Sequence, residues 1–165
     1  MAASISFADV SKRYAGGVAG AAAALDHASF DIAAGEFVYL TGHSGAGKST
    51  VFRLLAAIER PTAGTVLVNQ QNVGRLSPAA VPFLRRNLGL VLQDQRLLFD
   101  RTVFDNVSLP LAVAGVPPRD AAKRARAALD KVGLLGRERA NPIALSGGEP
   151  QRVCIARAVV NRPVL

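Results

Sequence analysis

Eight consecutive residues have the types and the spacing of a phosphate-binding loop. Residues 42–49 read Gly-His-Ser-Gly-Ala-Gly-Lys-Ser and fit the pattern G-x-x-x-x-G-K-[ST] at every fixed position. Glycines let the backbone curl, so that several N–H groups converge on one anion. Lys48 can place an ammonium beside the β- and γ-phosphates of a nucleotide, and Ser49 can offer a hydroxyl to Mg²⁺. The pattern therefore predicts a site for a nucleoside triphosphate.

The predicted phosphate contacts come from the whole loop and the first helical residues after it. Thr50 is expected to assist through its N–H or hydroxyl, whereas His43 fills a variable position and needs no chemistry of its own. The predicted set is Gly42, His43, Ser44, Gly45, Ala46, Gly47, Lys48, Ser49 and Thr50.

Two flanking elements must position this loop. The apolar run Phe37–Thr41 before it is typical of a buried strand in a parallel sheet. Residues 48–59 after it read as a helix, because apolar residues recur at helical spacing (Val51, Leu54, Leu55 and Ile58). The N-terminus of such a helix adds a partial positive charge at the loop.

A second motif, Leu145-Ser146-Gly147-Gly148-Glu149, opens the last predicted helix, which spans residues 149–160. Ser146 is predicted as its N-cap, with Glu149 three residues on completing a capping box. Adjacent glycines at a helix start leave N–H groups open to an anion. Taken alone, the motif is an ordinary helix start.

The remaining pattern is that of an α/β core with an inserted helical lobe. Short strands are predicted at residues 5–10, 28–32, 65–69 and 88–92, and Pro117-Pro118 opens a helix that Gly133 closes. We therefore expect a nucleotide-binding α/β core with antiparallel N-terminal strands (1–92), a helical subdomain (93–150), and a helix followed by the start of a further strand (151–165). The Gly- and Ala-rich run 15–24 is predicted as a loop.

The composition excludes several classes of protein. One cysteine rules out a disulfide framework and a cysteine-rich zinc site, and two histidines leave little for a histidine-based metal site. No apolar run approaches the roughly 20 residues that span a bilayer. The net charge of +8 comes from scattered residues, which favours a solvated basic surface, so we expect no nucleic-acid partner.

Together, the loop and the second motif resemble the ATP-binding subunits of ABC transporters, whose signature is L-S-G-G-[QE]. The resemblance implies a P-loop NTPase (RecA-like, ABC ATPase) fold that uses ATP and Mg²⁺. It implies that Ser146, Gly147, Gly148 and Glu149 face the nucleotide of a second copy in a head-to-tail homodimer. It further implies that Tyr14 stacks on adenine. Gln93 would contact Mg²⁺ and the attacking water, so that Lys48 and Gln93 carry the catalysis.

Longer blocks resemble the cell-division branch of this family. They are residues 42–50, 58–61, 81–86, 100–107 and 155–161. This resemblance implies an integral membrane partner that docks on residues 96–107, and a peripheral location at the cytoplasmic face of the bacterial inner membrane. The alternatives are a lipoprotein-release or efflux ATPase of the same family.

The chain departs from the family pattern in two places. The family continues with a strand ending in Asp-Glu, but Glu149 is the last acidic residue here. Asp94 ends an apolar run, but Gln93 interrupts the expected pattern. We therefore expect a core that is incomplete at its C-terminal end, and ATP binding with poor hydrolysis.

The second departure is Pro150, which stands where the family usually has Gln. Two other classes remain open, a non-catalytic nucleotide-binding interaction protein and a P-loop protein that binds nucleic acid.

Overall fold

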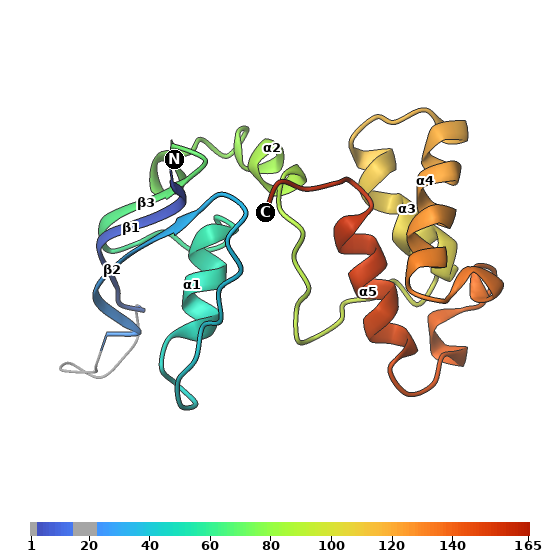
Figure 1. Cartoon of the computed structure of the whole chain (residues 1–165), viewed down its shortest axis with the longest axis horizontal. Helices are drawn as coiled ribbons and strands as arrows, with labels where there is room; N and C mark the ends of the chain where they lie inside the picture. Colours follow the sequence, from blue (N-terminus) through green and yellow to red (C-terminus); the bar gives the residue numbers. More distant parts are fainter. Residues whose placement is uncertain (1–2, 15–22) are drawn as a thin grey trace. The chain divides into compact units, whose positions relative to one another are not determined.

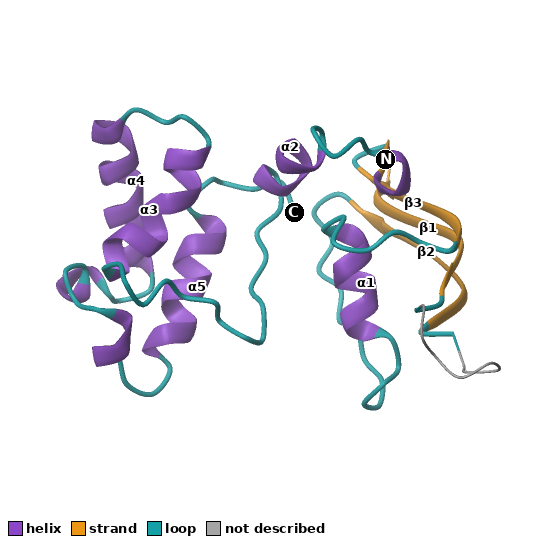
Figure 2. Ribbon diagram, turned by 180° about the vertical axis from the view of Figure 1, so that it is seen from behind, coloured by secondary structure: helices purple, strands orange, loops and turns teal. Residues whose placement is uncertain are grey.

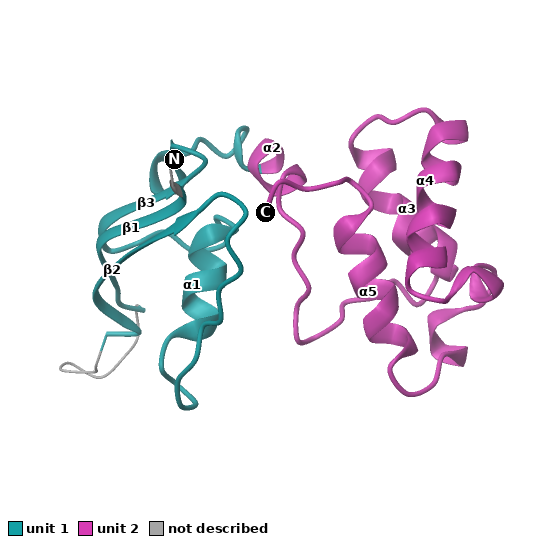
Figure 3. Cartoon of the chain, in the orientation of Figure 1, with its two compact units in different colours: residues 1–81 teal, residues 82–165 magenta. Residues whose placement is uncertain are grey.

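The computed structural model describes residues 3–14 and 23–165 of the chain. These residues form two compact units, Met1–Val81 and Pro82–Leu165 (Figure 3). Each unit is described by itself below. The domain limits expected from the sequence, at residues 92 and 150, remain a prediction.

The first unit contains an antiparallel sheet and one helix (Figure 1). The strand order is β2-β1-β3-β4, so the N-terminal strand lies inside the sheet. The helix begins directly after the glycine-rich loop. The elements are β1 (Ala3–Lys12), β2 (Leu25–Ala33), α1 (Lys48–Leu55), β3 (Ala63–Val68), β4 (Gln71–Asn72) and the short 3₁₀ helix η1 (Val73–Arg75).

A bulge explains the spacing of the buried residues in β1. Ile5, Phe7 and Val10 are all buried, although strict alternation would place the third at position 9. The pairing of β1 with β2 shifts between Phe7 and Val10, and Asp9 has a φ of 54°. The extra residue returns Val10 to the face that Ile5 and Phe7 bury. The strands predicted at 5–10 and 28–32 are therefore confirmed with longer bounds, and the strand predicted at 65–69 is confirmed but begins at Ala63 and ends at Val68.

The predicted strand at Phe37–Thr41 is wrong in this structure. The segment forms no strand, and the exposed fractions of Phe37 and Tyr39 are both 80%. A parallel strand is stabilised by the strands on its two sides, and the only sheet among the described residues contains the four antiparallel-paired strands β1–β4. An apolar run alone does not provide those partners.

The second unit is helical. Helices α3, α4 and α5 pack around one core (Figure 2). Its most deeply buried side chains include Val103, Val107, Leu111, Leu129 and Val153. The elements are α2 (Val81–Arg86), which leads into the unit, α3 (Val103–Val113), α4 (Pro118–Lys131), η2 (Leu135–Arg137), η3 (Pro142–Ala144) and α5 (Glu149–Val159).

Local signals account for the ends of these helices. Pro118 opens α4, as predicted, because a proline in the first helical turn removes an N–H that has no intrahelical partner. Helix α3 was expected only as part of a helical lobe. Thr102 caps it in a full capping box, in which the Thr102 side chain accepts from the Asp105 N–H and Asp105 accepts from the Thr102 N–H.

The predicted strand at 88–92 does not form, but Gly89 and the preceding Asn87 make hydrogen bonds with Val164 and Leu165. The Gly89 N–H donates to the Leu165 carbonyl (2.8 Å), and the Leu165 N–H donates to the Asn87 carbonyl (3.3 Å). This is the bonding pattern of one rung in a parallel pair, with Leu88 opposite Leu165. Val91 and Leu92 beyond it are exposed.

Most of the run predicted as a loop at 15–24 lies outside the described residues. None of the helices in the described parts of the chain is long and apolar enough to cross a bilayer.

Candidate functional site

The glycine-rich loop leads into an uncapped helix N-terminus. Gly42, Gly45 and Gly47 have φ values of 144°, 84° and 84°, conformations that favour glycine. Gly47 is the N-cap of α1, and no side chain of the described residues caps this helix end. The N–H groups of the first turn have no intrahelical acceptor, so they are open to an anion at the mouth of the loop.

Lys48 folds back over the loop that precedes it. Its Nζ donates to the carbonyl oxygens of Gly42 (2.6 Å) and His43 (2.7 Å). The ammonium therefore lies against the loop backbone, on the residue that begins α1. A cation here and the open amides of the helix make an arrangement that suits a polyphosphate.

The other loop residues divide into exposed and buried groups. Ser49 is exposed, so its hydroxyl is accessible to a ligand, whereas Thr50 is buried. Nδ1 of His43 is 2.7 Å from the Ser44 carbonyl. Because a carbonyl oxygen only accepts, Nδ1 carries the proton in this bond. His43 thus binds the backbone of its own loop, as expected for a residue without chemistry.

Tyr14 lies beside this helix. Its hydroxyl is 3.3 Å from the Thr50 hydroxyl, and the residue is 42% exposed. The structure therefore brings Tyr14 and the phosphate loop together in the first unit, although 36 residues separate Tyr14 from Thr50 in the sequence.

The second motif differs from its predicted capping geometry. Helix α5 begins at Glu149 with Gly148 as its N-cap, so the prediction that Ser146 is the N-cap is wrong. The carboxylate of Glu149 accepts from the Ser146 N–H at 2.9 Å, which is only the returning half of a capping box. Gly147 has a φ of 53°, and this turn separates Ser146 from the helix, which begins at Glu149 as predicted.

The surroundings of Glu149 favour the charged form of its carboxyl group. The hydrogen bond from the Ser146 backbone, together with the nearby Arg137 and Arg152, lowers the pKa of this carboxyl. Arg137 Nε lies 3.7 Å from the carboxylate and also donates to the Ala144 carbonyl through its NH2 group at 2.8 Å. Pro150 is in the first turn of α5 and is tolerated there, as predicted.

Gln93 is exposed and lies in a bend, two residues before a segment that α5 holds firmly. Arg157 of α5 donates to the carbonyl oxygens of Gln95 (2.7 Å) and Arg96 (3.0 Å). Cys154 Sγ also contacts the Gln95 carbonyl, at 3.3 Å. The second unit thus joins the Gln93 segment to the helix that begins at the second motif.

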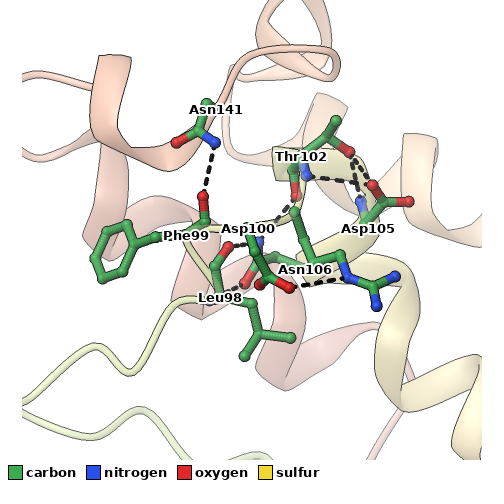
Figure 4. Close-up of polar contacts among 8 residues, drawn as sticks. Leu98, Phe99, Asp100, Thr102, Asp105, Asn106 and Asn141 are labelled. Carbon is green, nitrogen blue, oxygen red and sulfur yellow. Dashed lines mark hydrogen bonds and ion pairs between the residues drawn. The ribbon is translucent and has the colours of Figure 1, made fainter.

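Sequence reasoning missed the side chains that hold these parts. Arg157 and Lys12 were not singled out, and neither was Asn106, which is fully buried in α3. Asn106 accepts from the Leu98 N–H and donates to the carbonyls of Leu98 and Thr102 (Figure 4). The one available signal was the pair Thr102-x-x-Asp105, which marks a helix start.

Comparison with known protein families identifies the family of a chain that combines these two motifs. The family described as "ABC transporter" matches residues 25–165. The chain belongs to the ABC transporter family. Two solved structures are similar over nearly its full length. A dimeric ATP-binding cassette in a post-hydrolysis state, bound to ADP and Pi, aligns with a TM-score of 0.87 and 32% identity, over 96% of this chain and 70% of that one. The cbiO1 protein of Clostridium perfringens aligns with a TM-score of 0.84 and 27% identity, over 98% of this chain and 62% of that one. The expected P-loop NTPase fold of the ABC type is confirmed.

Known relatives of the chain show which branch of the ABC transporter family it resembles. The cell division ATP-binding protein FtsE of Escherichia coli (strain K12) is 52% identical over 161 residues, covering 98% of this chain and 71% of that protein. FtsE of Haemophilus influenzae is 49% identical, over 98% of this chain and 72% of that protein. The methionine import ATP-binding protein MetN 2 of Burkholderia mallei is 47% identical, over 99% of this chain and 41% of that protein. The chain is thus an ABC ATP-binding subunit similar to FtsE, and the expected resemblance to the cell-division branch is confirmed.

Proposed function

We propose that this chain binds ATP with Mg²⁺ and serves an FtsE-like ABC complex, in which ATP binding and hydrolysis act on a membrane partner in bacterial cell division. The observation that carries the proposal is the uncapped N-terminus of α1 behind three glycines of positive φ, with Lys48 lying over the loop. The similarity to FtsE supports the cell-division assignment.

Each predicted site residue has its own proposed role in binding ATP. The amides of residues 44–50 and the ammonium of Lys48 bind its oxygens, and Lys48 exchanges its bonds to the Gly42 and His43 carbonyls for bonds to phosphate. Tyr14 stacks on the adenine. Gln93 orients the attacking water, since phosphoryl transfer depends on positioning and on charge neutralisation.

The side chains proposed to bind a metal suit Mg²⁺ bound together with a nucleotide better than a metal ion whose ligands all come from the protein. Across the described parts of the chain, no three His, Cys, Asp or Glu side chains lie together as a metal site. Mg²⁺ in nucleotide sites keeps several waters and takes one or two protein oxygens plus phosphate oxygens. Ser49, exposed at the start of α1, and Gln93, also exposed, provide such oxygens. Bound Mg²⁺ would neutralise charge on the phosphates.

We propose that two copies close head to tail around two nucleotides. Ser146, Gly147, Gly148 and Glu149 of each copy would then face the γ-phosphate bound by the other. The backbone N–H groups of Gly147 and Gly148, directly before α5, make no hydrogen bond within the described residues and suit an anion, and the similar cassette bound to ADP and Pi is dimeric. The negative charge of Glu149 is directed to the Ser146 N–H and toward Arg137, so it is partly neutralised at this surface.

The proposed membrane partner is an FtsX-like integral membrane subunit, contacted by residues 96–107 at the cytoplasmic face of the inner membrane. Leu98 and Phe99 are exposed in this segment, and their backbone is held by Asn106 and Asn141 (Figure 4). An exposed apolar pair on a fixed backbone suits a protein contact. Co-purification of an FtsX-like subunit with the chain, lost on Phe99→Asp, is the expected result. Association with a lipoprotein-release or efflux subunit in its place would support the alternative.

We expect the proposed site by itself to hydrolyse ATP slowly. It draws on Lys48, Ser49, Gln93 and the loop amides, and none of these groups is a carboxylate that could order water around Mg²⁺ or polarise the attacking water. Steady-state phosphate release that disappears in Lys48→Ala would contradict this expectation.

Calorimetric titration with MgATP tests the binding itself. The wild-type chain should bind, and Lys48→Ala should weaken binding by more than about tenfold, because a charge-assisted phosphate contact is worth more than about 1.4 kcal/mol. Lys123→Ala removes the same charge from the exposed face of α4 and should bind as the wild type does. Equal binding by the two variants would overturn the proposal.

A further inference from the structure

The Tyr14 ring has a cation on one face. Nζ of Lys12 lies over the ring, 5.0 Å from its centroid, which is within the range of a cation–π interaction. The Lys12 side chain is only 11% exposed, whereas Tyr14 as a whole residue is 42% exposed. The cation is therefore largely sheltered from water, and Tyr14 still has exposed surface for a ligand.

Lys12 is itself held by the turn that follows α1. Its Nζ is 2.8 Å from Oε2 of Glu59 and donates to the Arg60 carbonyl at 2.9 Å. Because this ammonium has both an ion pair and a backbone acceptor in a mostly buried position, its place over the ring is well defined.

The neighbouring residues are held by the same stretch of chain. The Arg13 N–H donates to the Thr62 hydroxyl (3.0 Å), and the Tyr14 hydroxyl lies 3.3 Å from that of Thr50. Residues 48–62 thus begin with the helix that follows the phosphate loop, and they also contact each of residues 12–14. Side-chain contacts therefore fix the position of the Tyr14 ring relative to the phosphate loop.

We propose that Lys12 is a positioning residue of the nucleotide site, which supports one face of the Tyr14 ring so that the adenine stacks on the opposite face. The inference rests on the proposed ATP binding and on the assignment of Tyr14 to the base. The Lys12 cation covers one face of the Tyr14 ring and fixes the plane of the ring. The opposite face is then available to the base, at a fixed distance from the phosphate loop. Lys12 then affects recognition of the base and leaves recognition of the phosphates unchanged.

The test compares two ligands on each variant: MgATP, and magnesium tripolyphosphate, which lacks the base. Lys12→Met keeps the length of the side chain and removes the cation. We expect its affinity for MgATP to fall by about three- to tenfold, the range that corresponds to a cation–π contact of roughly 0.7–1.4 kcal/mol. Its affinity for tripolyphosphate should stay within about twofold of the wild type. The ratio of the two affinities is independent of how much of the variant is folded.

Conservative variants sharpen the result. Lys12→Arg should recover most of the ATP affinity, because a guanidinium also stacks on an aromatic face. Glu59→Gln should give an intermediate loss, since the ammonium loses its ion pair and keeps only neutral acceptors. Lys123→Met on α4 is the matched control and should behave as the wild type does.

Fluorescence gives a readout at the ring itself. The sequence contains no Trp and two Tyr, so in a Tyr39→Phe background Tyr14 is the only strong fluorophore. MgATP should change its emission and tripolyphosphate should not, and Lys12→Met should reduce the change.

An unchanged ratio of affinities in Lys12→Met would overturn the inference while leaving ATP binding intact. Equal losses for both ligands would assign Lys12 to the phosphates or to the fold, and would also overturn it. A wild-type chain that binds neither ligand would overturn the proposed function, and this inference with it.

Discussion

The guanidinium of Arg157 and the carbonyl of Gln95 are joined by a hydrogen bond of 2.7 Å, although 62 residues separate them in the sequence. A second bond from the same guanidinium reaches the Arg96 carbonyl at 3.0 Å. One side chain of α5 therefore fixes the backbone directly after Gln93, where Arg96 has a φ of 45°. A planar group with several donors suits this pair of acceptors better than an ammonium does.

Replacing Arg157 should destabilise the helical unit. Arg157→Ala removes two charge-assisted hydrogen bonds and should lower the free energy of unfolding by about 1.5–3 kcal/mol, measured by urea denaturation. The Cys154 thiol should also react faster with a thiol reagent, since the Gln95 segment lies against it. Arg124→Ala, on the exposed face of α4, should change neither quantity. A stability equal to that of the wild type would show that the two bonds contribute nothing.

Two glycines of the phosphate loop should differ sharply when each becomes alanine. Both have a φ of 84°, so each alanine carries the conformational cost of about 1–2 kcal/mol. A Cβ on Gly45 would meet nothing within 4 Å, but one on Gly47 would lie 2.3 Å from the Ala24 carbonyl oxygen. Gly47→Ala should therefore displace the start of α1 and abolish ATP binding. Gly45→Ala should bind measurably. Similar behaviour in calorimetry and in urea unfolding would contradict the predicted close approach.

Asn106 should contribute more to stability than Asn141, although both bind the same loop (Figure 4). Asn106→Ala empties a fully buried site and leaves the Leu98 N–H without its partner, whereas the carbonyls of Leu98 and Thr102 keep bonds from the backbone N–H groups of residues 101 and 106. We expect a loss of about 2–4 kcal/mol in the free energy of unfolding. Asn141 is exposed, and Asn141→Ala should cost less than about 1 kcal/mol, because water replaces its bond to the Phe99 carbonyl. The prediction fails if Asn141→Ala is the more damaging change.

Glu149 should titrate below its ordinary pKa of 4.5, chiefly because its carboxylate accepts from the Ser146 N–H. A carboxyl whose pKa is lower in the folded state adds stability above its unfolded pKa. That contribution is lost as the pH falls through the folded value. NMR titration of the Glu149 side chain should show this shift. Ser146→Ala keeps the N–H and should preserve most of the shift, whereas Arg137→Ala should raise the pKa part of the way back. An ordinary pKa in the wild type would rule out the hydrogen bond.

Elements with local causes were predicted well from the sequence. The proline at the start of α4, the alternation in β1 and the glycines around residue 45 all act through their own backbone or their near neighbours. The apolar run at 37–41 was misread because a parallel strand needs strands beside it, which a run of apolar residues does not supply. The start of α5 at Glu149 was predicted, but its N-cap was placed at Ser146, because a serine three residues before a glutamate is typical of a capping box. The positive φ of Gly147 separates Ser146 from the helix, and Gly148 is the N-cap instead.

The sequence by itself determined the parts of the phosphate site, since a lysine after a glycine-rich loop at a helix start is a local arrangement. It also determined the family, through two motifs that no ordinary loop combines. Only the tertiary structure decided which side chains hold those parts in place. Lys12 reaches the Arg60 carbonyl across 48 residues, and Arg157 reaches Gln95 across 62. Contacts of such sequence separation arise from how the elements pack, and no local pattern of residue types records them.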